Sequence, residues 1–269
     1  MPIKLTGKQQ TLLKKVFENL NDEVNYVVLR RHEKLPADVP GCQDKQLDVD
    51  ILVEKDDFQK TITILETIGF SSSYGNGNSR VKYITKALHN PIKCLKIVKK
   101  SPYKAERAMG ITLLEKFSPS KKMSSYKYAM ETGRLLRILE SDGLKIDVKP
   151  HLSHKSPHNR KRIRLDPEVE EKMLERKKND KEFFIPSYPD EFAHLIAHVV
   201  FDYKGAFSSY YHQRCCYLAD KVFSSEELTR EFDEILELIF YDASNKVFEL
   251  SEKRNFEQIY DELKTLSNY

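Results

Sequence analysis

Two aspartates lie one residue apart in an aliphatic segment, LDVDILV, at residues 47–53. Side chains alternate between the faces of a strand, so Asp48 and Asp50 are expected to share one face. Two like charges this close repel each other, and burial raises the free energy of each. A divalent cation compensates such a pair, and hard Mg²⁺ prefers carboxylate oxygens. The alternative is the solvent face of an edge strand, where acids alternate with aliphatic residues without a further role.

A third acid, Asp147, lies between Ile146 and Val148 in the segment LKIDVKPH. Three aspartates from two strands are able to hold two Mg²⁺ (or Mn²⁺) ions about 3.5–4 Å apart, an arrangement used for in-line phosphoryl or nucleotidyl displacement. The pattern therefore predicts that Asp48, Asp50 and Asp147 are both metal ligands and catalytic residues.

The order of these segments resembles the nucleotidyltransferase fold of the polymerase-beta type. It is most similar to a branch of uncharacterised bacterial and archaeal nucleotidyltransferases, some of them found among surface-polysaccharide biosynthesis proteins. The matching segments cover most of the chain but are short: YVVLR (26–30), LPADVPG (35–41), LDVDILV (47–53), LKIDVKPH (144–151) and HLIAHVVFDYKGAFSSYY (194–211).

This resemblance implies an α+β protein with a nucleotidyltransferase-type mixed sheet, flanking helices and a helical C-terminal domain. Asp48 and Asp50 would be the paired metal ligands, and Asp147 would be a third ligand that helps to deprotonate the acceptor hydroxyl. An NTP such as ATP would be the donor. The acceptor is left open between a sugar, a lipid-linked glycan, another small molecule, a protein side chain and RNA.

One departure from the family concerns the turn after the first strand. Typical members have Gly-Ser there, whereas this chain has Leu29-Arg30. Arg30 or Arg31 is expected to supply a charge-assisted phosphate contact instead. Surface pairing of these arginines with Glu33 or Asp44 is the alternative. Loss of the Gly-Ser turn is equally compatible with a non-catalytic module that binds a nucleotide or glycan.

The resemblance also implies that His198, Asp202 and Lys204 face a cleft between two domains and contact nucleotide or acceptor. His194 and His198 are one helical turn apart, but the HEXXH glutamate of zinc proteases is absent, which favours an interior histidine bonded to a neighbour. Ser208 opens a helix, where it is expected either to contact phosphate or simply to cap the helix.

The elements that position these residues can be read from periodicity and turn residues. We expect a helix over 6–21 that ends at Asn21-Asp22, and a strand over 25–30 that leads into a loop over 34–46. A second helix follows Asp56-Asp57 and ends at Gly69. Later elements are a turn at 74–79 between short strands, an SDG hairpin between 134–140 and 144–152, and C-terminal helices over 189–205, 208–223, 225–245 and 246–266.

Three parts are expected: a nucleotidyltransferase-like α/β domain (1–155), a basic and charged connector (156–185) and a helical domain (186–269). The basic segment 154–164 has almost no aromatic residues, which favours a solvated linker over a nucleic-acid contact. An RNA-directed enzyme or RNA-binding protein remains an alternative on the strength of this segment alone.

Bulk composition narrows the class of protein further. The 45 basic and 41 acidic residues give a formal net charge of +4, so global charge does not argue for a nucleic-acid partner. The four cysteines form no CxxC pair, which is typical of reduced thiols. No apolar run approaches the ~20 residues of a membrane span. We therefore expect a cytoplasmic protein.

Overall fold

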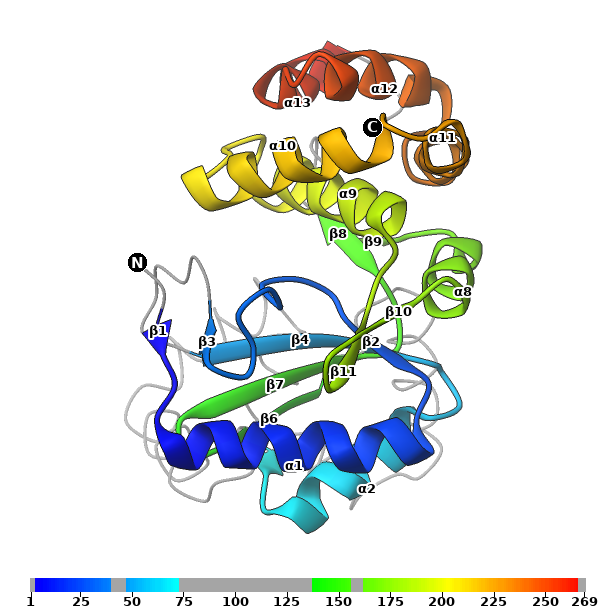
Figure 1. Ribbon diagram of the computed structural model, residues 1–269. Coiled ribbons are helices and arrows are strands. Elements are labelled where there is room, and N and C mark those ends of the chain that lie inside the picture. Colours follow the sequence, from blue (N-terminus) through cyan, green and yellow to red (C-terminus); the bar gives the residue numbers. More distant parts are fainter. Residues whose placement is uncertain (1–2, 40–46, 73–136, 156–161, 266–269) are drawn as a thin grey trace, which may run out of the picture.

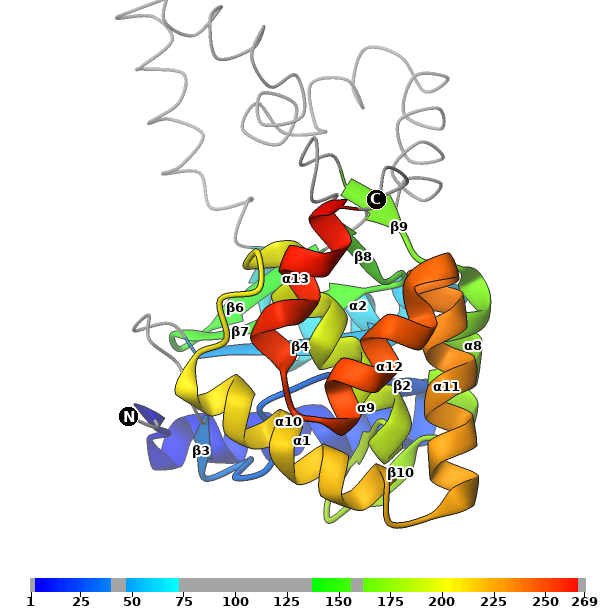
Figure 2. The same ribbon diagram turned by 90° about the horizontal axis from the view of Figure 1, so that it is seen from above.

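The computed structural model describes residues 3–39, 47–72, 137–155 and 162–265 (Figure 1). The fold belongs to the α+β class, as predicted. Helices cover both sides of a central mixed sheet, and most of the C-terminal helices lie together on one side (Figures 1 and 2). The strands and turn predicted between residues 74 and 133 lie outside the described residues.

The central sheet has the strand order β2-β4-β7-β6-β5. Strands β4 and β7 are parallel, whereas the other neighbours are antiparallel. Residues Asp142 and Gly143 link β6 to β7 with φ values of 51° and 74°, which confirms the hairpin predicted at SDG. The strands are β2 (Tyr26–Val28), β4 (Leu47–Val53), β5 (Ser71–Ser72), β6 (Arg137–Ser141) and β7 (Leu144–Lys149).

Helix α1 (Gly7–Glu23) and helix α2 (Phe58–Ile68) pack on one face of the sheet (Figure 1). A capping box of Thr6 and Gln9 begins α1. The predicted stop at Asn21-Asp22 is wrong, since the helix continues to Glu23. The Asn21 side chain bonds outside the helix, where it donates to the Glu182 carbonyl at 2.8 Å and accepts from the Tyr26 hydroxyl at 2.7 Å.

Helix α2 ends where the sequence predicts, because Gly69 adopts φ 110° at its C-terminus. Asp57 precedes the helix but does not cap it. Its carboxylate instead accepts a hydrogen bond from the backbone N–H of Asn25 at 2.8 Å, which ties the start of α2 to the segment before β2.

Strand β4 separates its aliphatic and acidic residues between the two faces of the sheet. Val49, Ile51 and Val53 are buried against the helices α1 and α2. Asp48 and Asp50 share the opposite face, as predicted. The edge-strand alternative is wrong, because β4 lies between β2 and β7 and Asp50 is only 5% exposed.

Strand β7 has the same division of residues. Leu144, Ile146 and Val148 are buried in the core beside α1 and α2. Lys145, Asp147 and Lys149 alternate with them and are half-buried on the face that carries Asp48 and Asp50. Two adjacent strands therefore present five charged side chains to the side of the sheet where the C-terminal helices lie (Figure 1).

The predicted solvated linker is wrong for the part of it that the structure describes. Strand β8 (Ser153–Lys155) pairs with β9 (Arg162–Arg164), His154 is 5% exposed, and Arg164 forms an ion pair with Glu170 at 3.1 Å. Further along the chain come α8 (Pro167–Glu175) and a hairpin of β10 (Lys178–Asp180) and β11 (Phe183–Ile185). Near the N-terminus, β1 (Ile3–Lys4) pairs with β3 (Asp38–Val39), inside the segment predicted as a loop.

The C-terminal helices enclose a second hydrophobic cluster, to which Val27, Leu29 and Leu52 of the sheet region also contribute. These helices therefore cover the face of the sheet that carries the aspartates. They are α9 (Tyr188–Ala197), a π-helical segment η1 (His198–Asp202), α10 (Ser209–Val222), α11 (Glu226–Phe240), a short 3₁₀ segment η2 (Tyr241–Ala243), α12 (Ser244–Glu252) and α13 (Phe256–Thr265).

Three of the predicted C-terminal helices are interrupted. The expected helix over 225–245 ends at Phe240, where Tyr241 adopts φ 45° and begins the 3₁₀ segment η2. The expected helix over 246–266 is split into α12 and α13, where Arg254 adopts φ 59°. The expected helix over 189–205 changes to π geometry at His198. Gly205 does end this segment, at φ 75°, and a Cβ atom there would lie 2.5 Å from the Cβ of Tyr260. None of the helices in the described ranges combines the length and apolar composition that a membrane crossing requires.

Candidate functional site

The sheet brings the three predicted aspartates together. Asp50 and Asp147 are register partners in the parallel strands β4 and β7, so their side chains project to the same side. Asp48 lies two residues before Asp50 on that same face. Asp147 is far from Asp48 and Asp50 in the sequence, but the pairing of β4 with β7 brings the three carboxylates close together.

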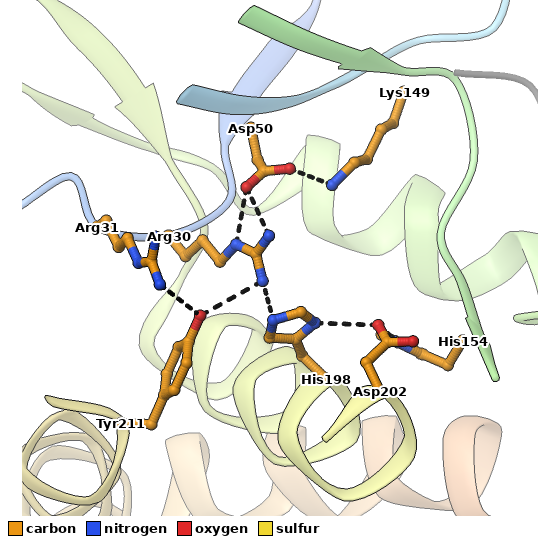
Figure 3. Close-up of polar contacts among 8 residues, drawn as sticks. All are labelled: Arg30, Arg31, Asp50, Lys149, His154, His198, Asp202 and Tyr211. Atoms are coloured by element: carbon orange, nitrogen blue, oxygen red, sulfur yellow. Dashed lines mark hydrogen bonds and ion pairs between the residues drawn. The ribbon is translucent and has the colours of Figure 1, made fainter. Parts of the chain in front are cut away.

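Asp50 is fully compensated by two cationic side chains (Figure 3). Arg30 donates to its Oδ2 atom from Nε at 2.8 Å and from Nη2 at 2.7 Å, and Lys149 contacts its Oδ1 atom. Burial alone would raise the pKa of Asp50, but the charges and hydrogen bonds of Arg30 and Lys149 hold that pKa well below its usual range. Asp50 is therefore a permanent anion with both oxygens occupied.

No residue in the described ranges forms an ion pair with Asp48 or Asp147. Burial raises the pKa of Asp48, and the Asp50 charge adds to this effect while Lys145 opposes it. Burial also raises the pKa of Asp147 to about 6, with a further contribution from the Asp50 charge. Among the described residues, the buried Oδ1 atom of Asp48 has no hydrogen-bond partner. A buried carboxylate oxygen without a partner calls for an explanation, and a bound cation would supply one.

These carboxylates fit a hard divalent cation such as Mg²⁺. Their oxygens are the donor type that Mg²⁺ prefers, and the Oδ1 atom of Asp48 accepts no hydrogen bond from the part of the chain that the structure describes. A cation near Asp48 and Asp147 would also favour the charged form of both. Asp50 differs from them, because it joins a metal site only if Arg30 or Lys149 leaves one of its oxygens.

Arg30 reaches Asp50 from the turn that follows β2. The backbone N–H of Leu29 donates to the Asp50 carbonyl at 2.9 Å, so Arg30 emerges beside this aspartate. Its Nη1 atom contacts Nε2 of His198 and lies 3.4 Å from the hydroxyl of Tyr211. Arg30 thus connects the sheet to the helices η1 and α10 (Figure 3).

Arg31 adopts φ 60°, a conformation that non-glycine residues rarely take. Its Nη2 atom donates to the Tyr211 hydroxyl at 3.4 Å, and its guanidinium lies 5.7 Å from the centre of that ring. Glu33, the expected surface partner of these arginines, instead forms an ion pair with Arg214 and accepts a hydrogen bond from Tyr210. Asp44, the other expected partner, lies outside the described residues.

His198 and Asp202 lie beside Arg30 at this charged cluster. His198 Nδ1 is 3.1 Å from Asp202 Oδ2, and His154 Nδ1 is 3.4 Å from the same oxygen. Burial and the charge of Arg30 lower the pKa of His198 to about 3, so this ring is neutral at physiological pH. An arginine only donates, so Nε2 of the neutral ring faces Arg30 as acceptor and Nδ1 carries the proton toward Asp202.

Two other predicted residues are placed differently. Lys204 is exposed at φ 57°, and no described residue forms an ion pair with its side chain. Ser208 caps helix α10, with its hydroxyl accepting from the backbone N–H of Tyr211 at 3.4 Å. The structure thus confirms the capping alternative for Ser208 and leaves Lys204 outside the charged cluster.

Sequence reasoning missed three members of the site: Lys149, His154 and Tyr211. The position of Lys149 could have been predicted, because it follows Asp147 by two residues in the same strand and its side chain therefore lies on the same face. His154 was assigned to a linker, and only the packing of β8 against η1 brings it inside. Tyr211 carried no signal beyond its place at the start of a helix.

Comparisons of the chain with protein-family models, with curated proteins and with solved structures returned no match.

Proposed function

We propose that this protein is a Mg²⁺-dependent nucleotidyltransferase. It transfers a nucleoside monophosphate from an NTP to an acceptor and releases pyrophosphate. The observation that carries the proposal is the pair Asp48 and Asp147, which flank Asp50 on one covered face of the sheet. A buried oxygen of Asp48 has no hydrogen-bond partner among the residues that the structure describes. The resemblance of the sequence motifs to the polymerase-beta type of nucleotidyltransferase supports the same assignment.

Each charged residue has a role in this proposal. Asp48 and Asp147 hold the cation, which when bound neutralises charge on the phosphates. Arg30, Arg31 and Lys149 add positive charge beside the carboxylates and attract the triphosphate. Asp147, kept in its charged form by the cation, is also placed to accept the proton of an acceptor hydroxyl.

The helical side of the site is suited to selecting the acceptor. Tyr211 and His198 approach the same guanidinium from α10 and η1, so the sheet and the helices meet at Arg30. Acceptors that fit the proposal are a sugar, a glycan, a small molecule or a protein hydroxyl.

A second candidate is a non-catalytic module that binds a nucleotide or glycan. The observation in its favour is that both carboxylate oxygens of Asp50 form ion pairs, one with Arg30 and the other with Lys149. In this case Arg30 and Lys149 serve the fold, and ligand binding does not depend on Asp147.

Thermal melting with each NTP, with and without Mg²⁺ or Mn²⁺, separates the two candidates. A ligand at 100 times its Kd stabilises the folded state by about 2.7 kcal/mol, which a melt detects. The catalytic proposal predicts a metal-dependent increase in Tm with at least one NTP that is lost in Asp48→Asn. The variant Asp22→Asn, which changes an exposed acid on α1, is the matched control and keeps the increase.

Pyrophosphate release then distinguishes catalysis from binding. The stabilising NTP is incubated with candidate acceptors, and wild type is compared with Asp147→Asn. An NTP that binds with the same affinity in Asp147→Ala, without pyrophosphate release in wild type, would support the binding module instead.

A further inference from the structure

A second group of ligand-type side chains lies on the helical side of the aspartates. His154, His198 and Asp202 each place a donor atom within 4.8 Å of the others. The Nδ1 atoms of the two histidines point at the same carboxylate oxygen of Asp202 (Figure 3). The histidines are buried, with exposures of 5% and 7%, so this group is enclosed by the protein.

His194 lies beside this group of three residues. Its side chain is 5% exposed, and among the described residues its Nδ1 atom has no hydrogen-bond partner. The ring centres of His154, His194 and His198 form a nearly equilateral triangle with sides of 5.8, 6.2 and 6.3 Å. A buried nitrogen without a partner, on a ring beside two other imidazoles, is an independent sign of a missing ligand.

The helix geometry explains why three of these residues share one face. His194, His198 and Asp202 are spaced by four residues, which is close to one turn of an α-helix. The π-helical segment from His198 to Asp202 has a wider turn, so the second spacing of four also returns to the same face. His154 approaches this face from β8, which is fixed by its pairing with β9.

We propose that His154, His194, His198 and Asp202 form a binding site for a divalent transition metal, with Zn²⁺ as the representative ion. Imidazole nitrogens and one carboxylate oxygen are the donors that such ions take, in contrast to the all-oxygen group of Asp48 and Asp147. Donors bound at ~2.0–2.2 Å in a tetrahedral site lie roughly 3.3 Å apart. The separations within the group of His154, His198 and Asp202, which are at most 4.8 Å, therefore have to contract only modestly, and His194 has to turn its ring toward the ion. This site does not rest on the proposed transfer activity.

Metal binding has a specific consequence for Arg30. The contact between Arg30 Nη1 and His198 Nε2 requires the ring proton to be on Nδ1. A metal ion that binds Nδ1 moves this proton to Nε2, which then no longer accepts from the guanidinium. Metal binding therefore breaks one contact of Arg30, whereas its contacts with Asp50 are unaffected. An Arg30→Gln variant is expected to bind the metal more tightly than wild type, because it lacks the competing cation.

Titration with Co²⁺ tests the site directly. Tag-free, full-length protein is treated with chelator and titrated while the d–d absorption of Co²⁺ is followed. The proposal predicts one ion bound per chain, with affinity reduced at least about tenfold in Asp202→Asn and in His154→Gln. Asp22→Asn, which changes an exposed acid of α1, and His212→Gln, which changes a half-exposed histidine of α10, are the controls and bind as wild type does.

X-ray absorption at the zinc edge provides a measurement that needs no variant. The wild-type protein loaded with one equivalent of Zn²⁺ is expected to show only nitrogen and oxygen ligands, with the multiple scattering of imidazole. A sulfur shell at about 2.3 Å would assign the ion to cysteines and overturn the proposal. Failure to bind Co²⁺ stoichiometrically, or equal affinity in folded Asp202→Asn, would overturn it as well.

Discussion

Arg30 forms an ion pair with Asp50 through two guanidinium nitrogens, which lie 2.8 Å (Nε) and 2.7 Å (Nη2) from the same carboxylate oxygen. The aspartate is 5% exposed, so its charge depends on this partner and on Lys149 for compensation. Removal of one member of a buried ion pair leaves an uncompensated charge, which typically costs 3–5 kcal/mol. This relationship makes the charged cluster a part of the fold as well as a candidate site.

The first prediction concerns this pair. Arg30→Met is expected to lower the free energy of unfolding by about 3–5 kcal/mol, because Asp50 is left with Lys149 alone. Urea denaturation at neutral pH measures the change. Arg230→Met removes an exposed arginine of α11 and is expected to cost less than about 1 kcal/mol. An equal decrease in the free energy of unfolding of the two variants would show that the buried ion pair stabilises the fold no more than an exposed one.

The second prediction concerns pH. The pKa of Asp147 is raised from 3.8 to about 6 in the folded state, so the folded protein binds more protons than the unfolded chain between these values. The contribution of the Asp147 carboxyl to the free energy of unfolding therefore falls as the pH rises from about 4 to 6. Asp147→Asn is expected to match wild type near pH 4 and to exceed it by up to about 3 kcal/mol above pH 6. Urea denaturation across this range tests the sign, and a variant less stable than wild type at pH 7 would contradict it.

The third prediction compares two lysines of β7. Lys149 contacts Asp50, whereas Lys145 lies beside Asp48 in the register of β4 and β7. Lys149→Gln is expected to lower the free energy of unfolding by about 1–3 kcal/mol, because one Asp50 oxygen loses its charged partner. Lys145→Gln is expected to change it by less than about 1 kcal/mol. Thermal or urea unfolding of both variants under one condition settles the order.

The fourth prediction tests the junction between the π-helical segment and α13. Gly205 has φ 75°, and a Cβ atom there would lie 2.5 Å from Tyr260. Gly205→Ala is therefore expected to destabilise the fold by about 2–4 kcal/mol through backbone strain and overpacking. Gly7→Ala is the matched control, since no atom lies within 4 Å of its added Cβ and the position is helical. It is expected to be neutral or slightly stabilising.

Sequence patterns predicted the parts of the fold that depend on local chemistry. The alternation in LDVDILV placed Asp48 and Asp50 on one face, the SDG turn gave the β6–β7 hairpin, and Gly69 ended α2. Each of these rests on backbone preferences within a few residues.

The remaining features depend on contacts between distant segments. Compensation of Asp50 by Arg30 requires the pairing of β2 with β4, and burial of His154 requires β8 to pack against η1. No local pattern encodes either contact. The split between α12 and α13 was missed for a similar reason, because the segment 246–266 has helical periodicity throughout and lacks glycine and proline.

The π-helical segment gives the His194–Asp202 face one residue more than a continuous α-helix would need. Deleting one residue between His198 and Asp202, such as Val199 or Val200, would leave enough chain for a continuous α-helix. Asp202 would then follow His198 by three residues, a spacing that keeps two side chains on one face of an α-helix. The wider turn therefore accommodates an additional residue while Asp202 stays on the face that carries His198.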